Sequence, residues 1–186
     1  YKIMKKNILL LSLMGLLSLT SCKKEQDKKS EEVTVEEVKS TTFDITVELK
    51  IKKDDDLIIY YKDGTNEWIV EEKAVWYSVK GSEEFQTVVF KMPEGVLPND
   101  FRFDIGRNEF KGQQPIEIRK ITLSYLNSKF DVLQDEFLLY FKPNKYIAFD
   151  EKTKQYSFSV VDDYYDPYFE TTPLIYPRLS NVVLNK

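Results

Sequence analysis

Aromatic side chains in adjacent pairs offer the clearest chemistry in this sequence. Such pairs occur at Tyr60-Tyr61 and Trp76-Tyr77, and Trp68 lies between them. Flat apolar rings can stack on the C–H face of a sugar ring while polar neighbours bond its hydroxyls. In a β-strand, adjacent side chains point to opposite faces, so one ring of each pair must face away from the core. We therefore take Trp68, Trp76, Tyr77 and Tyr61 as candidate ligand-binding residues. The alternative is that the outward rings pack beneath a loop or the C-terminal segment.

A second aromatic group lies in the stretch DDYYDPYFETT, residues 162–172. Its four rings and four carboxylates could form a binding lip, and Tyr164 and Tyr165 join the candidates for ligand binding. The carboxylates could also supply oxygens to calcium, but EF-hand spacing is absent and we predict no metal site. The alternative is an aromatic clamp that fastens this loop to the rest of the fold.

One arginine stands in an alternating segment, FRFDI, where it could meet a ligand. Phe101, Phe103 and Ile105 share one face of this predicted strand, and Arg102 and Asp104 share the other. Arg102 could bind a sugar hydroxyl or a carboxylate, so it completes the candidate ligand-binding set. The alternative is a cross-strand ion pair, which contributes ~0.2–1 kcal/mol at a surface.

Composition excludes several classes of protein. Histidine is absent and there is a single cysteine, which excludes His-dependent nucleophilic sites, His-based zinc sites and an internal disulfide. A net charge of -4 with mixed signs argues against a nucleic-acid partner. No nucleophile elbow or phosphate loop is present, and no pair of glycosidase-type carboxylates is indicated. We expect a protein that is not an enzyme and holds no cofactor.

The single cysteine, Cys22, follows an apolar run. From Met4 the chain reads MKKNILLLSLMGLLSLTSC, with two lysines ahead of a run too short for a membrane span, which needs ~20 apolar residues. The end of this run, LTSC, resembles a bacterial lipobox. The resemblance implies removal of a signal peptide, residues 1–21, and lipidation of Cys22 as the first mature residue. The alternatives are an ordinary signal peptide with an incidental cysteine, or a buried apolar helix.

The stretch after Cys22 is highly charged. KKEQDKKSEEVTVEEVKS, residues 23–40, has no aromatic residue, proline or glycine and is too polar to fold alone. We expect residues 22–40 to be a lipidated tether, with a short helix as the alternative for its second half. Charges in this position resemble those that direct lipoproteins to the outer membrane, on its periplasmic or surface face. Acyl chains on Cys22 would make the lipid bilayer a partner.

From residue 41 the sequence has the pattern of β-strands. TTFDITVELKIK alternates apolar and polar residues, and LIIYY, KAVWYSV, FQTVVF and FRFDI follow at short intervals. A turn is expected at KDGTNE, and a hairpin across KGSEE. In IEIRKITLSYL, Ile116 and Ile118 have one parity and Ile121 and Leu123 the other. This change of parity predicts a β-bulge near Arg119-Lys120, or else a strand covered on both faces.

These patterns predict an all-β fold, with seven strands over residues 41–127 forming an antiparallel β-sandwich. The order of strands resembles the jelly-roll sandwiches of carbohydrate-binding modules. Residues 128–186 are expected to be an aromatic-rich extension packed on the sandwich. In this extension we predict a short helix in DEFLLYFKPN ending before Pro143, a hairpin around DEKTK, and a second short helix over Pro177 to Leu184.

The anchor, the jelly-roll resemblance and the outward rings together suggest a function. We expect a membrane-anchored lipoprotein whose sandwich binds a glycan or polysaccharide at the cell envelope without catalysis. The alternative is a structural lipoprotein, or one that binds an envelope protein and has no glycan ligand.

Overall fold

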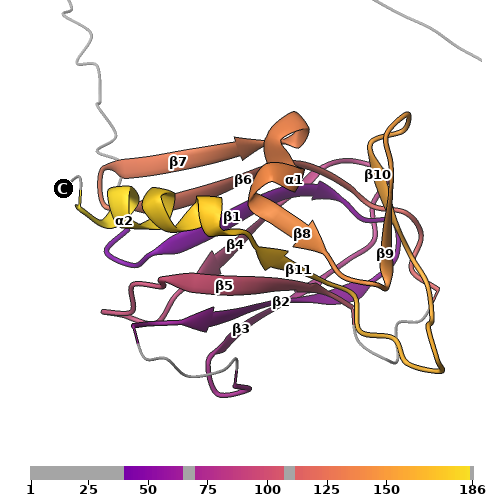
Figure 1. Ribbon diagram of the computed structural model, residues 1–186, viewed down its shortest axis with the longest axis horizontal. Helices are drawn as coiled ribbons and strands as arrows, with labels where there is room; N and C mark the ends of the chain where they lie inside the picture. Colours follow the sequence, from indigo (N-terminus) through magenta and orange to yellow (C-terminus); the bar gives the residue numbers. More distant parts are fainter. Residues whose placement is uncertain (1–39, 65–69, 107–111, 185–186) are drawn as a thin grey trace, which may run out of the picture. The chain divides into compact units, whose positions relative to one another are not determined.

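The computed structural model describes residues 40–64, 70–106 and 112–184 of the chain. The lipidation candidate Cys22, most of the tether and the ligand-binding candidate Trp68 lie outside these ranges. In the described part, two antiparallel β-sheets pack face to face (Figure 1). None of the helices in these ranges is long and apolar enough to cross a membrane.

The first sheet has four strands in the order β4-β1-β6-β7 (Figure 1). Its strands are β4 (Gln86–Lys91), β1 (Asp44–Lys50), β6 (Glu117–Tyr125) and β7 (Ser128–Leu133). Ile45, Val47 and Leu49 of β1 are fully buried, whereas Thr46 and Glu48 between them are partly exposed. The alternating pattern therefore predicted this strand and its buried face correctly.

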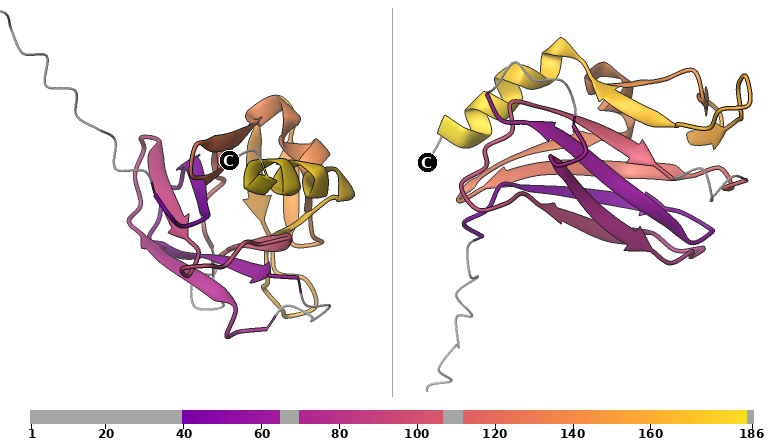
Figure 2. Two further views of the ribbon diagram at one scale, coloured as in Figure 1. Left: turned by 90° about the vertical axis from the view of Figure 1, so that its left-hand side faces the viewer. Right: turned by 90° about the horizontal axis from the view of Figure 1, so that it is seen from below.

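The second sheet has five strands in the order β3-β2-β5-β11-β8. Its strands are β3 (Ala74–Val79), β2 (Asp55–Lys62), β5 (Asp100–Ile105), β11 (Tyr168–Thr171) and β8 (Phe141–Pro143). Ile59, Phe103 and Phe169 lie opposite one another across three of these strands and are fully buried. They form the inner face of this sheet, and Figure 2 shows the two sheets as separate layers.

Strands that are far apart in the sequence pair within each sheet. β1 pairs with β6 in the first sheet while β2 pairs with β5 in the second. β4 then flanks β1, and β3 flanks β2. The predicted all-β antiparallel sandwich is confirmed. The described residues up to 127 supply six of its strands, one fewer than expected.

The β1–β2 and β3–β4 connections both cross from one sheet to the other, and they lie against each other. The expected hairpin across KGSEE was wrong, because β3 and β4 belong to different sheets and this segment joins them. It runs beside the β1–β2 connection, where Ser82 donates its backbone N–H to the carbonyl of Ile51 at 2.7 Å and Gly81 donates to Asp54 Oδ1 at 3.0 Å. A Cβ on Gly81 would lie 2.4 Å from the Lys52 carbonyl oxygen, so the contact requires glycine.

The predicted β-bulge is present in β6. Glu48 of β1 pairs with Lys120, but the next residue, Leu49, pairs with Ile118, so Arg119 is the extra residue. Because of this insertion, Ile118 and Ile121 are both fully buried although their spacing is odd. Arg119 itself is exposed, and its guanidinium lies 3.6 Å from the centre of the Phe85 ring.

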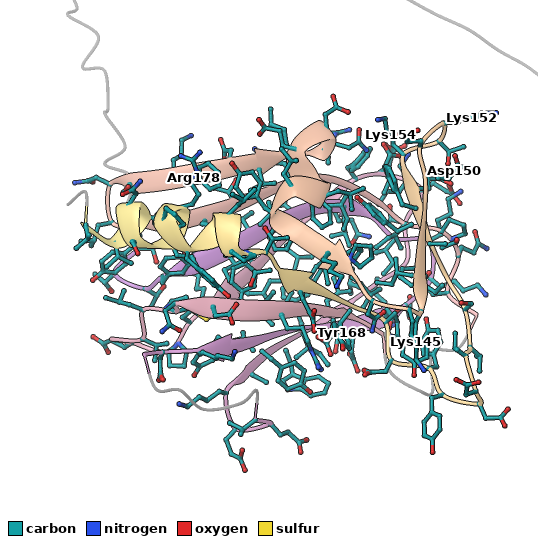
Figure 3. All side chains as sticks on the ribbon, in the orientation of Figure 1. Lys145, Asp150, Lys152, Lys154, Tyr168 and Arg178 are labelled. Atoms are coloured by element: carbon teal, nitrogen blue, oxygen red, sulfur yellow. The ribbon has the colours of Figure 1, made fainter. Side chains whose placement is uncertain are left out.

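The segment after residue 127 does more than pack on the sandwich. It supplies β7 to the first sheet and β8 and β11 to the second. The expected boundary at residue 127 therefore does not separate a sandwich from an extension, because strands from both sides of it form the same two sheets. The predicted hairpin around DEKTK is β9 (Ile147–Asp150) with β10 (Gln155–Phe158). Its turn is fixed by Asp150, which accepts hydrogen bonds from the backbone of Lys152 and Thr153 and is labelled in Figure 3.

Both predicted short helices are present. A 3₁₀ turn over Gln134–Glu136 leads into α1 (Phe137–Tyr140), which ends before Pro143 as expected. Pro143 lies in edge strand β8, where its missing N–H costs no ladder bond. A second 3₁₀ turn, Pro173–Ile175, precedes α2 (Tyr176–Leu184), which buries Leu179 and Val182 against the first sheet.

Candidate functional site

The outer face of the second sheet carries a row of side chains that crosses four strands. Trp76 of β3 lies opposite Ile58 of β2, Ile58 opposite Asp104 of β5, and Asp104 opposite Tyr168 of β11. Directly opposed residues in an antiparallel sheet point to the same face. Because Ile59, Phe103 and Phe169 face the core, this neighbouring row faces away from it.

A second outward row lies two residues further along each strand. It places Tyr60 of β2 opposite Arg102 of β5, and Arg102 opposite Glu170 of β11. Trp76, Tyr60, Tyr168, Arg102 and Asp104 therefore gather on one surface, which we call the aromatic face. Tyr168 is labelled in Figure 3.

Arg102 lies at the centre of the aromatic face. Its Nε donates to Asp104 Oδ1 at 2.7 Å and its Nη2 donates to Asp104 Oδ2 at 2.6 Å. Its guanidinium carbon lies 4.2 Å from the centre of the Tyr168 ring and 5.0 Å from that of Tyr60, within cation–π range. The expected ion pair exists, but it joins two residues of one strand and does not cross between strands. Arg102 thus contacts both tyrosines and the carboxylate.

Burial governs the electrostatics of this group. Asp104 is only 5% exposed although it lies on the outer face, and burial raises its pKa to about 6 against the opposing effect of Arg102. Burial also acts to lower the pKa of Arg102, but the hydrogen bonds and charge of Asp104 outweigh it and leave that pKa raised. The pKa of Tyr60 is raised by burial first and then by the charge of Asp104.

The paired aromatics divide between the two faces of their strands, as the alternation predicted. Trp76 is 43% exposed on the aromatic face. Tyr77 points between the sheets, with its ring centre 6.1 Å from that of Phe90, and is partly exposed because β3 is an edge strand. Tyr61 was the wrong choice within its pair, because it is buried opposite Phe101 in the core and Tyr60 is the outward ring.

The two loop tyrosines also have different environments. Tyr164 is 69% exposed and closes a tight turn with Val161, in which Asp162 and Asp163 both have positive φ. Tyr165 was a wrong candidate for ligand binding, because it is buried and a Cβ on Gly106 would lie 3.5 Å from its ring. Tyr165 therefore acts as the clamp that was the alternative for this loop. In the described ranges, no three acidic side chains lie together as metal ligands.

Three residues of the aromatic face, Tyr60, Tyr168 and Asp104, were missing from the candidate set. Tyr168 directly precedes the buried Phe169, so alternation places it outward once Phe169 is known to be in the core. The same parity argument separates Tyr60 from Tyr61. What the sequence did not contain is the pairing of β11 with β5, which brings Tyr168 beside Arg102 from 66 positions away in the chain.

A separate hollow of about 580 Å³ lies between α2 and the loop that precedes β5. Its wall includes the Lys62–Asp100 ion pair, with Nζ and Oδ2 at 3.0 Å, and apolar side chains of Leu97 and Val183. Asp100 also accepts a hydrogen bond from Thr171. No pattern in the sequence indicated this hollow, which depends on the packing of α2.

No protein-family model matches this sequence, and neither curated proteins nor solved structures include one that is significantly similar to it. The function must therefore be argued from the geometry of the chain itself.

Proposed function

We propose that this protein is a lipid-anchored, non-catalytic glycan-binding protein of the cell envelope, and that the aromatic face is its binding site. The observation that supports this is the group of three rings, Trp76, Tyr60 and Tyr168, around the Arg102–Asp104 pair. Rings of this kind offer stacking surfaces to sugar C–H groups. The exposed carboxylate of Glu170, opposite Arg102 in the neighbouring strand, offers hydrogen-bonding atoms beside them.

The anchor is the second part of the proposal. The lipobox-like LTSC sequence supports lipidation of Cys22, and the charged stretch after it supports placement at the outer membrane on a tether. Such a tether would let the aromatic face reach a polysaccharide near the membrane surface.

A binding screen with the full chain tests the proposal. Detergent-solubilised protein would be applied to a glycan array and to native gels that contain soluble polysaccharides. We expect retardation by at least one glycan, and loss of that retardation when Trp76, Tyr60 and Tyr168 are replaced together by alanine. Binding that survives this triple replacement would show that the site lies elsewhere. Tyr164→Ala is the matched control, since it removes an exposed ring outside the aromatic face.

A second candidate function is supported by a different surface. Leu138 and Leu139 of α1 and Leu174 of the adjoining 3₁₀ turn are 41%, 55% and 57% exposed. Exposed leucines that lie close together are typical of protein contacts. They favour the alternative of an envelope lipoprotein that binds another protein. In that case, Leu139→Glu should abolish capture of a stoichiometric envelope partner, and Trp76→Ala should leave it unchanged.

A further inference from the structure

Carboxylates outnumber cations around the rings of the aromatic face. After burial, the charges that raise the pKa of Tyr60 are those of Asp104, Glu71 and Asp166, and only Arg102 acts in the opposite direction. Glu170 lies beside Arg102 in the neighbouring strand. Glu71, Asp166 and Glu170 are all exposed, so they remain available to a ligand.

The positive charge of Arg102 is already neutralised. Two of its nitrogens donate to Asp104 at 2.7 and 2.6 Å, and its guanidinium lies over the rings of Tyr60 and Tyr168. Lys62, two residues beyond Tyr60 in β2, is paired with Asp100 at 3.0 Å. An anionic ligand on this face would therefore meet the exposed carboxylates of Glu71, Asp166 and Glu170. The exposed ammonium group of Lys142, which lies opposite Glu170 in β8, does not offset these three charges.

The rings are also widely spaced. Trp76 and Tyr168 lie in the same row but are separated by three steps between neighbouring strands. At about 4.8 Å for each step, the two positions are ~14 Å apart. One sugar ring is too small to contact both, so simultaneous contact requires several linked units.

We propose that the ligand of the aromatic face is an uncharged glycan chain of several sugar units, and that acidic polysaccharides are excluded. This inference rests on the proposed function and specifies its ligand. The rings contact sugar C–H faces, while Asp166 and Glu170 accept hydrogen bonds from sugar hydroxyls. The same carboxylates repel uronate groups, and this repulsion weakens as salt screens it.

The test compares neutral and acidic polymers on the full chain. The neutral probes are a linear β-glucan, a galactan, a mannan and a xylan; the acidic probes are polygalacturonate, alginate and hyaluronate. We expect retardation by one or more neutral polymers and by none of the acidic ones at low salt. For the neutral polymer that binds, affinity should rise at least tenfold from its two-unit to its six-unit oligosaccharide.

Charge removal provides the second arm of the test. The variant Glu71→Gln/Asp166→Asn/Glu170→Gln should bind acidic polymers more tightly than the unchanged protein, by about tenfold at low salt. The matched control Glu94→Gln/Glu136→Gln/Glu151→Gln removes three exposed acids from other surfaces and should change nothing.

The outcomes separate the two proposals. Acidic polymers that bind as tightly as neutral ones, or affinity that is independent of chain length, would overturn this inference and leave glycan binding intact. Absence of binding to every glycan would overturn the proposed function and this inference together.

Discussion

Arg102 and Asp104 bond to each other from the same side of one strand, through two hydrogen bonds of 2.7 and 2.6 Å. A bidentate pair two residues apart in β5 places a charged group in the middle of an aromatic surface without leaving either charge unpaired. Asp104 is buried at this position, and only Arg102 makes that burial tolerable. The pair therefore links the stability of the fold to the arrangement of the rings.

Replacement of Arg102 should lower the free energy of unfolding by an amount that depends on pH. Arg102→Ala leaves the buried carboxylate of Asp104 without its cation, and we expect a loss of about 3 kcal/mol in the free energy of unfolding at pH 8. The loss should be smaller at pH 5, where protonated Asp104 needs no cation. Urea unfolding at both pH values measures this. The double variant Arg102→Ala/Asp104→Ala should recover part of the loss, and an equal loss at both pH values would contradict the role of the buried charge.

The pKa of Asp104 predicts a second pH effect. Its folded value, about 6, is above its ordinary value of 3.8, so the native protein binds more protons than the unfolded chain between these pH values. Stability from Asp104 is then present below pH 4 and is lost as the pH rises through 6. Relative to Asp104→Asn, the free energy of unfolding should fall by up to ~3 kcal/mol from pH 4 to 7. A rise over the same range would show that Arg102 lowers the pKa instead.

The adjacent tyrosines Tyr60 and Tyr61 should respond in opposite ways to the same substitution. Tyr60→Ala removes a ring from the aromatic face and should weaken glycan binding about tenfold, which corresponds to ~1.4 kcal/mol. Tyr61→Ala removes a ring from the core and should lower the free energy of unfolding by about 3 kcal/mol. Titration of each variant with the glycan found in the screen, together with urea unfolding, separates the two effects. Similar changes in both variants would contradict the assignment of the two faces.

Gly81 should not tolerate a side chain. Gly81→Ala places a Cβ 2.4 Å from the Lys52 carbonyl oxygen, so the two connections between the sheets must move apart. We expect a loss of 1–3 kcal/mol, of the order seen on overpacking, in thermal or urea unfolding. Gly95→Ala is the control: its Cβ meets open space, so only its positive φ opposes the change. If the two variants lose equal stability, the clash at Lys52 is not the cause.

Cys22→Ala should abolish lipid attachment. We propose from the lipobox resemblance that Cys22 is the acylated residue. Metabolic labelling with a fatty acid and recovery of the protein in the membrane fraction should then both be lost. Ser21→Ala keeps a small residue before the cysteine and should retain both properties. Membrane recovery of Cys22→Ala equal to that of the unchanged chain would refute the anchor.

Short patterns in the sequence correctly predicted the features that depend on neighbouring residues alone. The parity change around Arg119 located the bulge, the alternation in β1 located its buried face, and Pro143 marked the end of α1. Long-range pairing was beyond such patterns. A turn such as KGSEE looks the same whether it joins paired strands or crosses between sheets, and only tertiary packing decides.

The candidate site, too, could be predicted from local patterns only in part. Alternation required one outward ring in each aromatic pair, but which ring of Tyr60-Tyr61 faces out depends on how β2 packs against its neighbours. Tyr168 comes to the aromatic face only because β11 pairs with β5. The alternation of apolar residues therefore indicated that an outward aromatic surface exists. The order of the strands in the sheet decides which residues belong to it.

The place of β7, β8 and β11 within the two sheets has a practical consequence for dissecting this protein. A fragment ending near residue 127 would lack β7, which pairs with β6, and β11, which pairs with β5. Strands β6 and β5 would then present unpaired backbone groups beside exposed core residues such as Phe103 and Ile121. Open edges of this kind pair with other chains, so such a fragment would form aggregates rather than a small binding module.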